Sequence, residues 1–484
     1  MRIGQTSIVV FLSTLVGAAL GFLGTLYFAR ELGAEVIGLY ALVMTVVTWL
    51  ILTADLGVGG ATVKRISEGT EPGAYLTAAV GWTLLLATAV SVVVVLGQPV
   101  LESYIAEFNQ YVALSVVWFV VVMIFVRLFY QFVSRILNGE RKVHIAGALD
   151  PVQIGGQSLI QVVLVLAGFG LVGMLVGYAI GGLLVGVLGL YWVTVRPSRP
   201  SRRHFRSLFD YAKFSWLGSL KSRTFNEVDI LLLGVFVQSA LVGVYSVVWS
   251  IAKFLELFGS AISQTVFPEI SHTSAQDSTE AVSGLLEDAL AFAGLVAVPG
   301  LVGGVLLADP LLGLYGPEFA EGTTVLGLLV LATLLYSYQK QLMNGLNGID
   351  RPDLAFRINA VFIALNAGLN VVLIPSFGIE GAAVASVVSV AVALALAHRT
   401  LARLVRFRTP VEELTRQAGA AAVMGAFVLG GRSLLETTRL AAYDVVVVLV
   451  LVPFGAGVYF AVLFAISGQF RTTVERNLPA ALAR

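Results

Sequence analysis

The chain has 484 residues, of which 58% are hydrophobic and only 12% are charged. Soluble proteins carry roughly 25% charged residues, so this composition excludes an ordinary soluble protein and indicates a membrane protein. The absence of cysteine excludes disulfides and thiol catalysis, and a formal net charge of +1 gives no sign of a polyanionic partner.

Apolar runs occupy most of the chain and are separated by short polar breaks. About 20 apolar residues cross the roughly 30 Å of hydrocarbon in a bilayer, and about fourteen runs reach that length. They predict an all-α polytopic membrane protein with no separate soluble domain. In chain order, the predicted spans are residues 7–29, 36–57, 74–97, 112–136, 148–168, 171–195, 210–236, 240–266, 288–308, 322–345, 356–375, 378–401, 416–434 and 443–467.

The stretch GFGLVG, Gly168 to Gly173, matches the G-x-G-x-x-G pattern of dinucleotide-binding folds. That pattern needs a strand before it, a helix after it and an acidic residue about 20 positions further on. Here it lies between the fifth and sixth predicted spans, with no acidic residue in reach. The stretch therefore predicts a tight turn and no nucleotide site.

Three sequence patterns recur about 205 to 209 residues further along the chain. GFGLVG recurs as SFGIEG (376–381), VIGLY (36–40) as LVGVY (241–245), and ILNGERK (136–142) as GLNGIDR (345–351). Their common order indicates a duplicated six-helix unit. Because six is an even number, the two copies enter the membrane in the same orientation and form parallel repeats. The predicted domains are an N-terminal six-helix lobe (1–200), a C-terminal six-helix lobe (201–408), and two additional spans with a cytoplasmic tail (409–484).

The loop charges predict the orientation, since Lys and Arg near span ends stay on the cytoplasmic side. With Arg2 inside, the inside breaks hold most of the cations, including those of the linker RPSRPSRRHFR (196–206) between the two lobes. Both termini are therefore predicted to be cytoplasmic. The linker has the charge of a nucleic-acid patch, but contact with anionic lipid headgroups is the favoured interpretation.

The candidate functional residues are the ionisable ones at membrane depth. A charge at the centre of a span costs at least about 2.5 to 3.5 kcal/mol and therefore usually faces protein or a water-filled cavity. The candidate cations are Arg30, Arg127, Lys221, Arg223 and Lys253, with Lys340 as a further cation, and the candidate acids are Asp55, Glu227, Asp229 and Glu256.

Spacing along the helix separates these candidates. Arg223 with Glu227, and Lys253 with Glu256, can share a helix face, so a structural role as ion pairs is about as probable as a functional one. Snorkelling accounts for Arg30 and Lys340 about as well as function does. Asp55, Arg127 and Lys221 have no partner along their own helices and are the stronger functional candidates. The small excess of cations favours an anionic substrate group such as a phosphate.

Several stretches resemble the Wzx-like polysaccharide and lipid-linked oligosaccharide flippases, a branch of the MOP exporter superfamily that also contains the MATE drug exporters. They are LGFLGTLYFARELGAEVIGLYALVMTVVTWLILTADLGVGGATVKRIS near the N-terminus, FNEVDILLLGVF (225–236), VGVYSVVWSI (242–251), LLGLYGPEFAEG (311–322) and LNGIDRPD (346–353). The resemblance implies two six-helix lobes around a cavity that opens alternately to either face of the membrane. It also implies that Asp229 is the acid of the family's VD-x-LLLG motif and that Lys221, Arg223 and Lys253 line the cavity.

The resemblance implies a transporter, and no enzyme, that flips a polyprenyl-phosphate-linked or polyprenyl-diphosphate-linked oligosaccharide across the cytoplasmic membrane. Its expected partners are the lipid-linked glycan, membrane lipids, glycan-assembly enzymes and a coupling ion, H⁺ or Na⁺, bound by Asp55, Glu227, Asp229 or Glu256. No cofactor or metal is expected, and there is no Walker A motif for ATP hydrolysis. The alternatives are a MATE-type cation-coupled drug exporter, which would favour an acidic cavity, a membrane glycosyltransferase and a scaffold protein.

Overall fold

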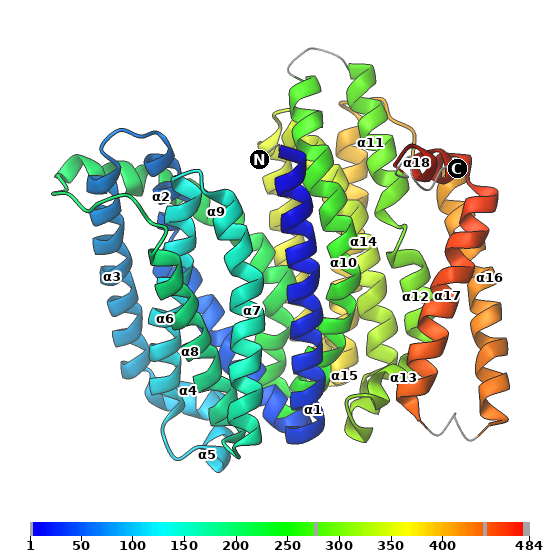
Figure 1. Cartoon of the computed structure of the whole chain (residues 1–484), viewed down its shortest axis with the longest axis horizontal. Helices are drawn as coiled ribbons and strands as arrows, with labels where there is room; N and C mark the ends of the chain where they lie inside the picture. The colour runs from blue at the N-terminus through cyan, green and yellow to red at the C-terminus, as the bar shows by residue number, and fades with distance from the viewer. Residues whose placement is uncertain (1–2, 275–278, 439–442, 478–484) are drawn as a thin grey trace. The chain divides into compact units, whose positions relative to one another are not determined.

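The computed structural model describes residues 3–274, 279–438 and 443–477, and the side chains of these residues except at 3–16, 18, 213–223, 226, 257–281 and 476–477. Within these residues there is no β-strand, and the all-α prediction is confirmed (Figure 1). The elements are α1 (Ile3–Asp55), α2 (Val58–Ser67), α3 (Pro72–Leu96), α4 (Gln98–Tyr104), α5 (Phe108–Tyr111), α6 (Val116–Gly139), α7 (Val143–Leu166), α8 (Gly170–Leu190), α9 (Arg202–Phe236), α10 (Ser239–Ser274), α11 (Thr279–Ala293), α12 (Ala297–Leu306), α13 (Ala308–Gly313), the 3-10 helix η1 (Pro317–Gly322), α14 (Thr323–Gly348), α15 (Pro352–Ala402), α16 (Val411–Glu436), α17 (Asp444–Ile466) and α18 (Gly468–Asn477).

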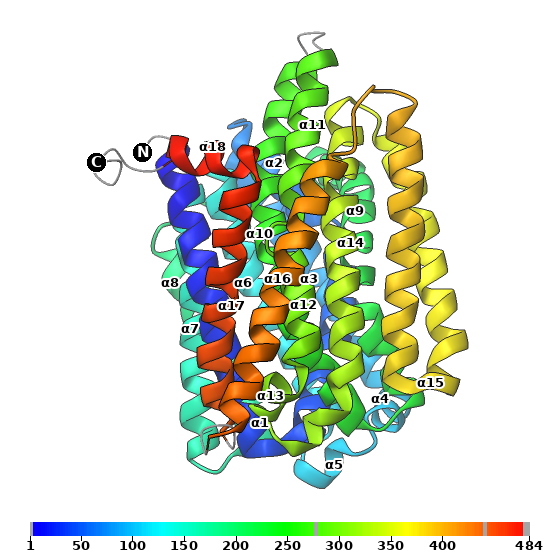
Figure 2. The same cartoon turned by 90° about the vertical axis from the view of Figure 1, so that its right-hand side faces the viewer.

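Eleven helical segments among the described residues are long and apolar enough to cross a membrane. Two of them, in α1 and α15, each consist of two helices joined at a glycine with a non-helical backbone, Gly33 (φ 81°) and Gly378 (φ 55°). Figure 2 shows α15 turning back on itself. At both breaks the positive φ falls on a residue without a Cβ, which adopts this conformation at little cost. The chain is thus a multi-pass membrane protein, and the exact count of fourteen spans stays a prediction.

The turns at the duplicated sequence patterns have matching backbone conformations. GFGLVG forms the predicted tight turn between α7 and α8, with Gly170 at φ 49°, and Gly378 of SFGIEG has φ 55°. The turns after the two Asn-Gly pairs also match, because Arg141 (φ 61°) and Asp350 (φ 57°) are both left-handed. Non-glycine residues seldom adopt this conformation, so its recurrence at equivalent positions supports the duplication.

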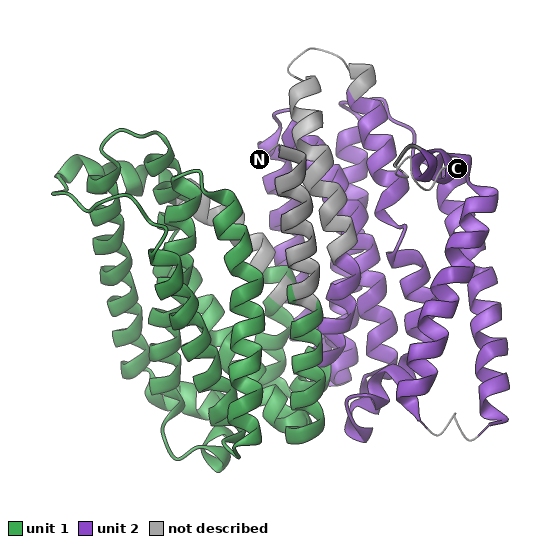
Figure 3. Ribbon diagram, viewed as in Figure 1, with its two compact units in different colours: residues 1–246 green, residues 247–484 purple. Residues whose placement is uncertain are grey.

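The chain divides into two compact units, residues 1–246 and 247–484, and the division falls within α10 (Figure 3). This division is based on spatial contacts, whereas the predicted lobes, 1–200 and 201–408 with the appendage 409–484, are based on sequence repetition. The lobe boundaries stay predictions.

In the first unit, the second half of α1 and the start of α10 touch through their backbones. A Cβ added to Gly38 would lie 1.7 Å from the Ser239 carbonyl oxygen, and a Cβ added to Gly243 would lie 1.9 Å from that of Ala34. The contact is reciprocal, since the offset that relates Gly38 to Gly243 also relates Ala34 to Ser239. Each helix therefore contributes a small-xxx-small motif, the pattern that lets membrane helices approach closely.

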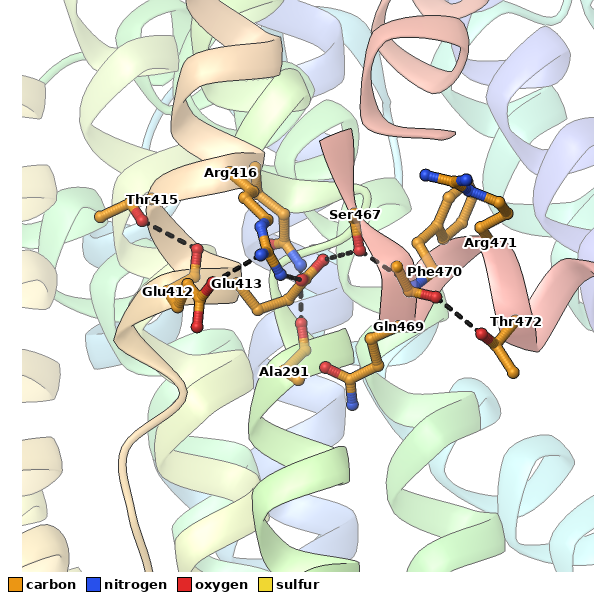
Figure 4. Close-up of polar contacts among 12 residues, drawn as sticks. Ala291, Glu412, Glu413, Thr415, Arg416, Ser467, Gln469, Phe470, Arg471 and Thr472 are labelled. Carbon is orange, nitrogen blue, oxygen red and sulfur yellow. Dashed lines mark hydrogen bonds and ion pairs between the residues drawn. The ribbon is translucent and has the colours of Figure 1, made fainter. Parts of the chain in front are cut away.

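In the second unit, the last three helices are attached to α11 through a buried polar cluster (Figure 4). Glu413 of α16 is 5% exposed and accepts a hydrogen bond of 2.7 Å from the Ser467 hydroxyl, at the start of α18. Arg416 lies 3.4 Å from the same carboxylate, and Gln417 donates to the Ala291 carbonyl of α11 at 2.7 Å. A buried carboxylate with these donors is stable where an unpartnered one would not be.

In the structure the linker comprises residues 191–201, between α8 and α9, and it is fixed to the first unit at the start of α9. His204 accepts a hydrogen bond from the backbone N–H of its N-cap residue Ser201 through Nδ1 and donates one through Nε2 to Glu71, at 2.9 Å each. Arg203 forms an ion pair with the same carboxylate. The His204 hydrogen bond and then the Arg203 charge hold the pKa of Glu71 below its ordinary value.

We expect Gly38→Ala to lower the free energy of unfolding by roughly 1–3 kcal/mol, because the added methyl group forces two backbones apart. Thermal and denaturant unfolding in detergent would measure the change. Gly303→Ala in α12 is the matched control, because a Cβ there meets nothing within 4 Å. It should be neutral or stabilising by up to about 1 kcal/mol. Equal effects of the two substitutions would contradict the close backbone contact.

The Glu71 contact should make stability depend on pH in one direction. The folded state lowers the pKa of this carboxyl, so its contribution is complete above the unfolded value of about pH 4.5 and is lost as pH falls through the folded value. We therefore expect Glu71→Gln to lower the melting temperature at pH 7 and to have little effect at the lowest pH at which the protein stays folded. Glu68→Gln, which removes a carboxylate paired with Arg65 alone, should show a smaller difference at pH 7.

Candidate substrate-binding site

Arg127 lies near the middle of α6 and points toward α1. Its Nη1 donates a 2.6 Å hydrogen bond to the hydroxyl of Thr48, which in turn donates to the Met44 carbonyl of the same helix at 2.8 Å. Among the described residues, Arg127 is half-buried and forms no ion pair with a carboxylate. A guanidinium held by one hydroxyl keeps four of its five N–H donors for another acceptor.

A second contact joins the same two helices further along their lengths. Arg135 forms hydrogen bonds of 2.5 and 3.3 Å with the two carboxylate oxygens of Asp55, whose Oδ1 also accepts from the backbone N–H of Gly59. A Cβ at Gly59 would lie 2.0 Å from the guanidinium, so a larger residue there would displace Arg135 from its place beside Asp55. The sequence provides no partner for Asp55 along its own helix, and the partner comes from α6.

The Arg127–Thr48 and Arg135–Asp55 contacts share one geometric pattern, which is not evident from the sequence alone. Thr48 and Asp55 are seven residues apart on α1, and Arg127 and Arg135 are eight residues apart on α6. Both spacings correspond to about two helical turns, so each pair of residues lies on one helix face. Arg135 lies at the very end of the predicted span 112–136 and is not among the predicted candidates, whereas α6 continues to Gly139.

The two acids of α9 also have partners within the first unit. Asp229 is 5% exposed and accepts a 2.6 Å hydrogen bond from the hydroxyl of Tyr245 on α10. Glu227 accepts a 3.3 Å hydrogen bond from Thr45 on α1. Asp229 and Glu227 are predicted candidates, whereas Tyr245 and Thr45 are not, because periodicity does not show which helices meet.

The charged candidates of the second unit lie on α10 and α14. Lys253 lies over the ring of Trp249 at 5.3 Å, a cation–π contact. Glu256 forms a 3.2 Å ion pair with Lys340 of α14, and Lys340 also lies over the ring of Tyr336 at 5.9 Å. Lys340 therefore has a protein partner at membrane depth.

The remaining candidate cations have a less defined environment. Arg30 is exposed and precedes the α1 break at Gly33. Lys221 and Arg223 are on α9, but their side chains lie outside the described residues. In the first unit the structure thus pairs Arg127 with Thr48, Asp55 with Arg135, and Asp229 with Tyr245. No group of acids and histidines suited to a metal occurs in the described part of the chain.

A multi-pass helical bundle with paired acids and an arginine held by a hydroxyl at membrane depth is typical of a membrane transporter. A family model described as "Polysaccharide biosynthesis protein" matches residues 3–274, which is more than half of the chain. The chain belongs to this family. A second model, MatE, matches residues 217–372.

Two relatives from Haloferax volcanii match along most of their length. The chain is 31% identical to a "Probable flippase AglR", with 99% of each protein covered, and 28% identical to a "Probable low-salt glycan biosynthesis flippase Agl15", with 91% of this chain and 92% of the relative covered. Among solved structures, "Lipid II flippase MurJ, inward closed conformation" is similar with a TM-score of 0.78 over 96% of this chain and all of the other, at 16% identity. That likeness shows a shared fold.

A double-mutant cycle with Asp55→Asn and Arg135→Gln should give a coupling free energy of roughly 1.5–3 kcal/mol, as expected for charge-assisted hydrogen bonds shielded from solvent. Unfolding of each variant in detergent would measure it. The same cycle on the more exposed pair Arg65 and Glu68, at 2.9 Å, is the control and should give about 0.2–1 kcal/mol. Equal coupling in both cycles would show that the α1–α6 pair contributes no more than a surface ion pair.

Proposed function

We propose that this protein flips a polyprenyl-phosphate-linked or polyprenyl-diphosphate-linked oligosaccharide across the cytoplasmic membrane by alternating access, for cell-surface polysaccharide or glycoprotein glycan assembly. Two relatives named as flippases match along nearly the whole chain, and one of them is named for glycan biosynthesis. The fold is also that of a flippase named for lipid II. These likenesses favour a lipid-linked glycan as the transported molecule.

Arg127 is the observation that carries the proposal. Its guanidinium has a hydroxyl partner and no carboxylate partner among the described residues, so its positive charge is available to a substrate. Arginine binds phosphate through two parallel hydrogen bonds, and these are stronger away from bulk water. Lys221, Arg223, Lys253 and Arg30 are proposed as further phosphate-binding cations, while the hydrocarbon tail stays in the bilayer.

The acids are proposed as the coupling site for H⁺ or Na⁺. Asp229 with Tyr245 and Glu227 with Thr45 are carboxylates whose hydroxyl partners can rearrange when a cation or proton binds, and Asp55 and Glu256 are further candidates. Transport needs no cofactor and no enzymatic step in this scheme. The positive-inside pattern supports cytoplasmic termini, and glycan-assembly enzymes are proposed as partners that supply the substrate.

Cation-coupled drug export is the second candidate, and the MatE match over residues 217–372 favours it. It places the function on the acids, so Asp229→Asn would abolish transport while Arg127→Gln would not. The partner of Asp55 weighs against it, because an acid paired with the Arg135 guanidinium is less available to a cationic drug.

Transbilayer movement of a fluorescent polyprenyl-phosphate-linked oligosaccharide in proteoliposomes tests the proposal. We expect Arg127→Gln to weaken the apparent substrate affinity roughly 10- to 100-fold, since it removes about 1.5–3 kcal/mol of charge-assisted hydrogen bonding. Thr48→Val should have a smaller effect, because the guanidinium keeps its charge. Arg403→Gln, at an exposed position outside the spans, should transport like the parent. Normal transport by Arg127→Gln would contradict the proposed role of Arg127.

A further inference from the structure

The first unit contains an apolar groove of about 700 Å³ that lies apart from the Arg127 contacts. It lies between α3, α6 and α8, and the first residues of the linker, Val193, Val195 and Pro197, form its end. Its lining is apolar except for the threonines Thr77 and Thr83. The volume lies within the roughly 300–1,000 Å³ typical of ligand pockets, and the lining suits a hydrocarbon chain.

The side wall of this groove opens toward the bilayer. Leu84 of α3 and Leu183 of α8 line it and are 52% and 42% exposed, and Phe125 of α6 is 36% exposed. Exposed apolar side chains on membrane helices face lipid, so a hydrocarbon chain can enter from the side without crossing water. A groove this size would otherwise leave its lining without packing partners.

The linker is fastened over the end of the groove by backbone hydrogen bonds. Glu140 accepts from the N–H groups of Thr194 and Val195, at 2.8 and 2.5 Å. On the other side, the Ser198 N–H donates to the Gly73 carbonyl at 3.2 Å, and a Cβ at Gly73 would lie 2.1 Å from the Arg196 carbonyl. The linker is thus a fixed part of the unit.

Two arginines flank the groove at this linker. Arg196 immediately precedes Pro197, which lines the groove, and Arg199 follows two positions later. Both are exposed and, among the described residues, neither forms an ion pair, whereas Arg203 is held by Glu71. The positive charge of the two arginines at one end of the groove complements an anionic headgroup, and the apolar lining complements the hydrocarbon chain joined to it.

Helix α6 separates this groove from the proposed phosphate site. Phe125, Phe129, Phe132 and Ile136 line the groove and lie on one face of the helix. At about 100° per residue, Arg127 lies on the opposite face, toward Thr48. A substrate whose phosphate is bound by Arg127 would have to pass its tail across α6 to reach the groove. The groove therefore needs an occupant other than the transported lipid.

We propose that the groove binds one hydrocarbon chain of an anionic membrane phospholipid, whose phosphate-bearing headgroup contacts Arg196 and Arg199. The bound lipid is a resident of the protein and is not transported. It fills the space between α3, α6 and α8 and neutralises the positive charge of Arg196 and Arg199 in the linker that precedes α9.

Native mass spectrometry of delipidated protein in detergent, titrated with phosphatidylglycerol or with phosphatidylcholine of the same chains, tests the proposal. The parent should bind phosphatidylglycerol more tightly. Arg196→Gln combined with Arg199→Gln should reduce that binding roughly 10- to 30-fold, at about a fivefold loss per arginine, and leave phosphatidylcholine binding unchanged. Leu84→Trp, which fills the groove, should weaken both, whereas Leu85→Trp on the neighbouring exposed position should weaken neither. Thr83→Trp fills the same groove from a second position.

Matched variants make the result specific. Arg403→Gln combined with Arg406→Gln removes the same charge from exposed positions in the second unit and should retain phosphatidylglycerol binding. Equal losses in both arginine pairs, or phosphatidylglycerol binding that survives both groove-filling substitutions, would overturn the proposal. The proposal would also be overturned if Leu84→Trp weakened the binding of polyprenyl phosphate and left the binding of phosphatidylglycerol unchanged. Arg127→Gln should bind phosphatidylglycerol normally, which separates this site from the proposed transport function.

Discussion

The contact between the backbones at Gly38 and Gly243 is the constraint on which the first unit depends. Side chains normally keep helix axes 8–10 Å apart, but here the carbonyl groups of Ala34 and Ser239 occupy the places that two Cβ atoms would take. The two glycines occupy equivalent positions of the predicted repeats, and so do Ala34 and Ser239. Helix α9 meets both of these helices, since Asp229 accepts a hydrogen bond from Tyr245 of α10 and Glu227 accepts one from Thr45 of α1.

Local features of the fold could be predicted from the sequence. Apolar runs indicated the helices, and the GFGLVG turn followed from its place between two runs, because only glycine adopts positive φ at little cost. The partners of the charged residues could not be predicted. Periodicity places Asp55 or Arg127 on a helix face, but the helix that meets that face is set by packing between segments some 80 residues apart. The spacings of seven residues on α1 and eight on α6 indicate the two pairs of contacts only when the two helices are known to lie side by side.

The way the charges are partnered bears on the sign of the transported group. In the first unit, Asp55 is paired with the charged Arg135, which was not among the candidate cations, whereas Arg127 and Asp229 are each held by a neutral hydroxyl. Counting charges in the sequence gave only a small excess of cations. The structure makes the asymmetry larger, because the paired Asp55 contributes little field while Arg127, beside a neutral partner, keeps its full charge. This favours an anionic cargo more strongly than composition did.

The cluster around Glu413 has a consequence for the history of this chain. The last two long helices follow the repeated part like an appendage, yet Gln417 satisfies a carbonyl of α11, and the Ser467 hydroxyl both caps α18 and binds the buried carboxylate. Deleting everything after residue 410 would leave the Ala291 carbonyl without its partner and uncover the apolar surface now packed by Met424 and Tyr459. Helices that are structurally required in this way are difficult to lose, so proteins descended from this chain are expected to keep both even where their role in transport changes.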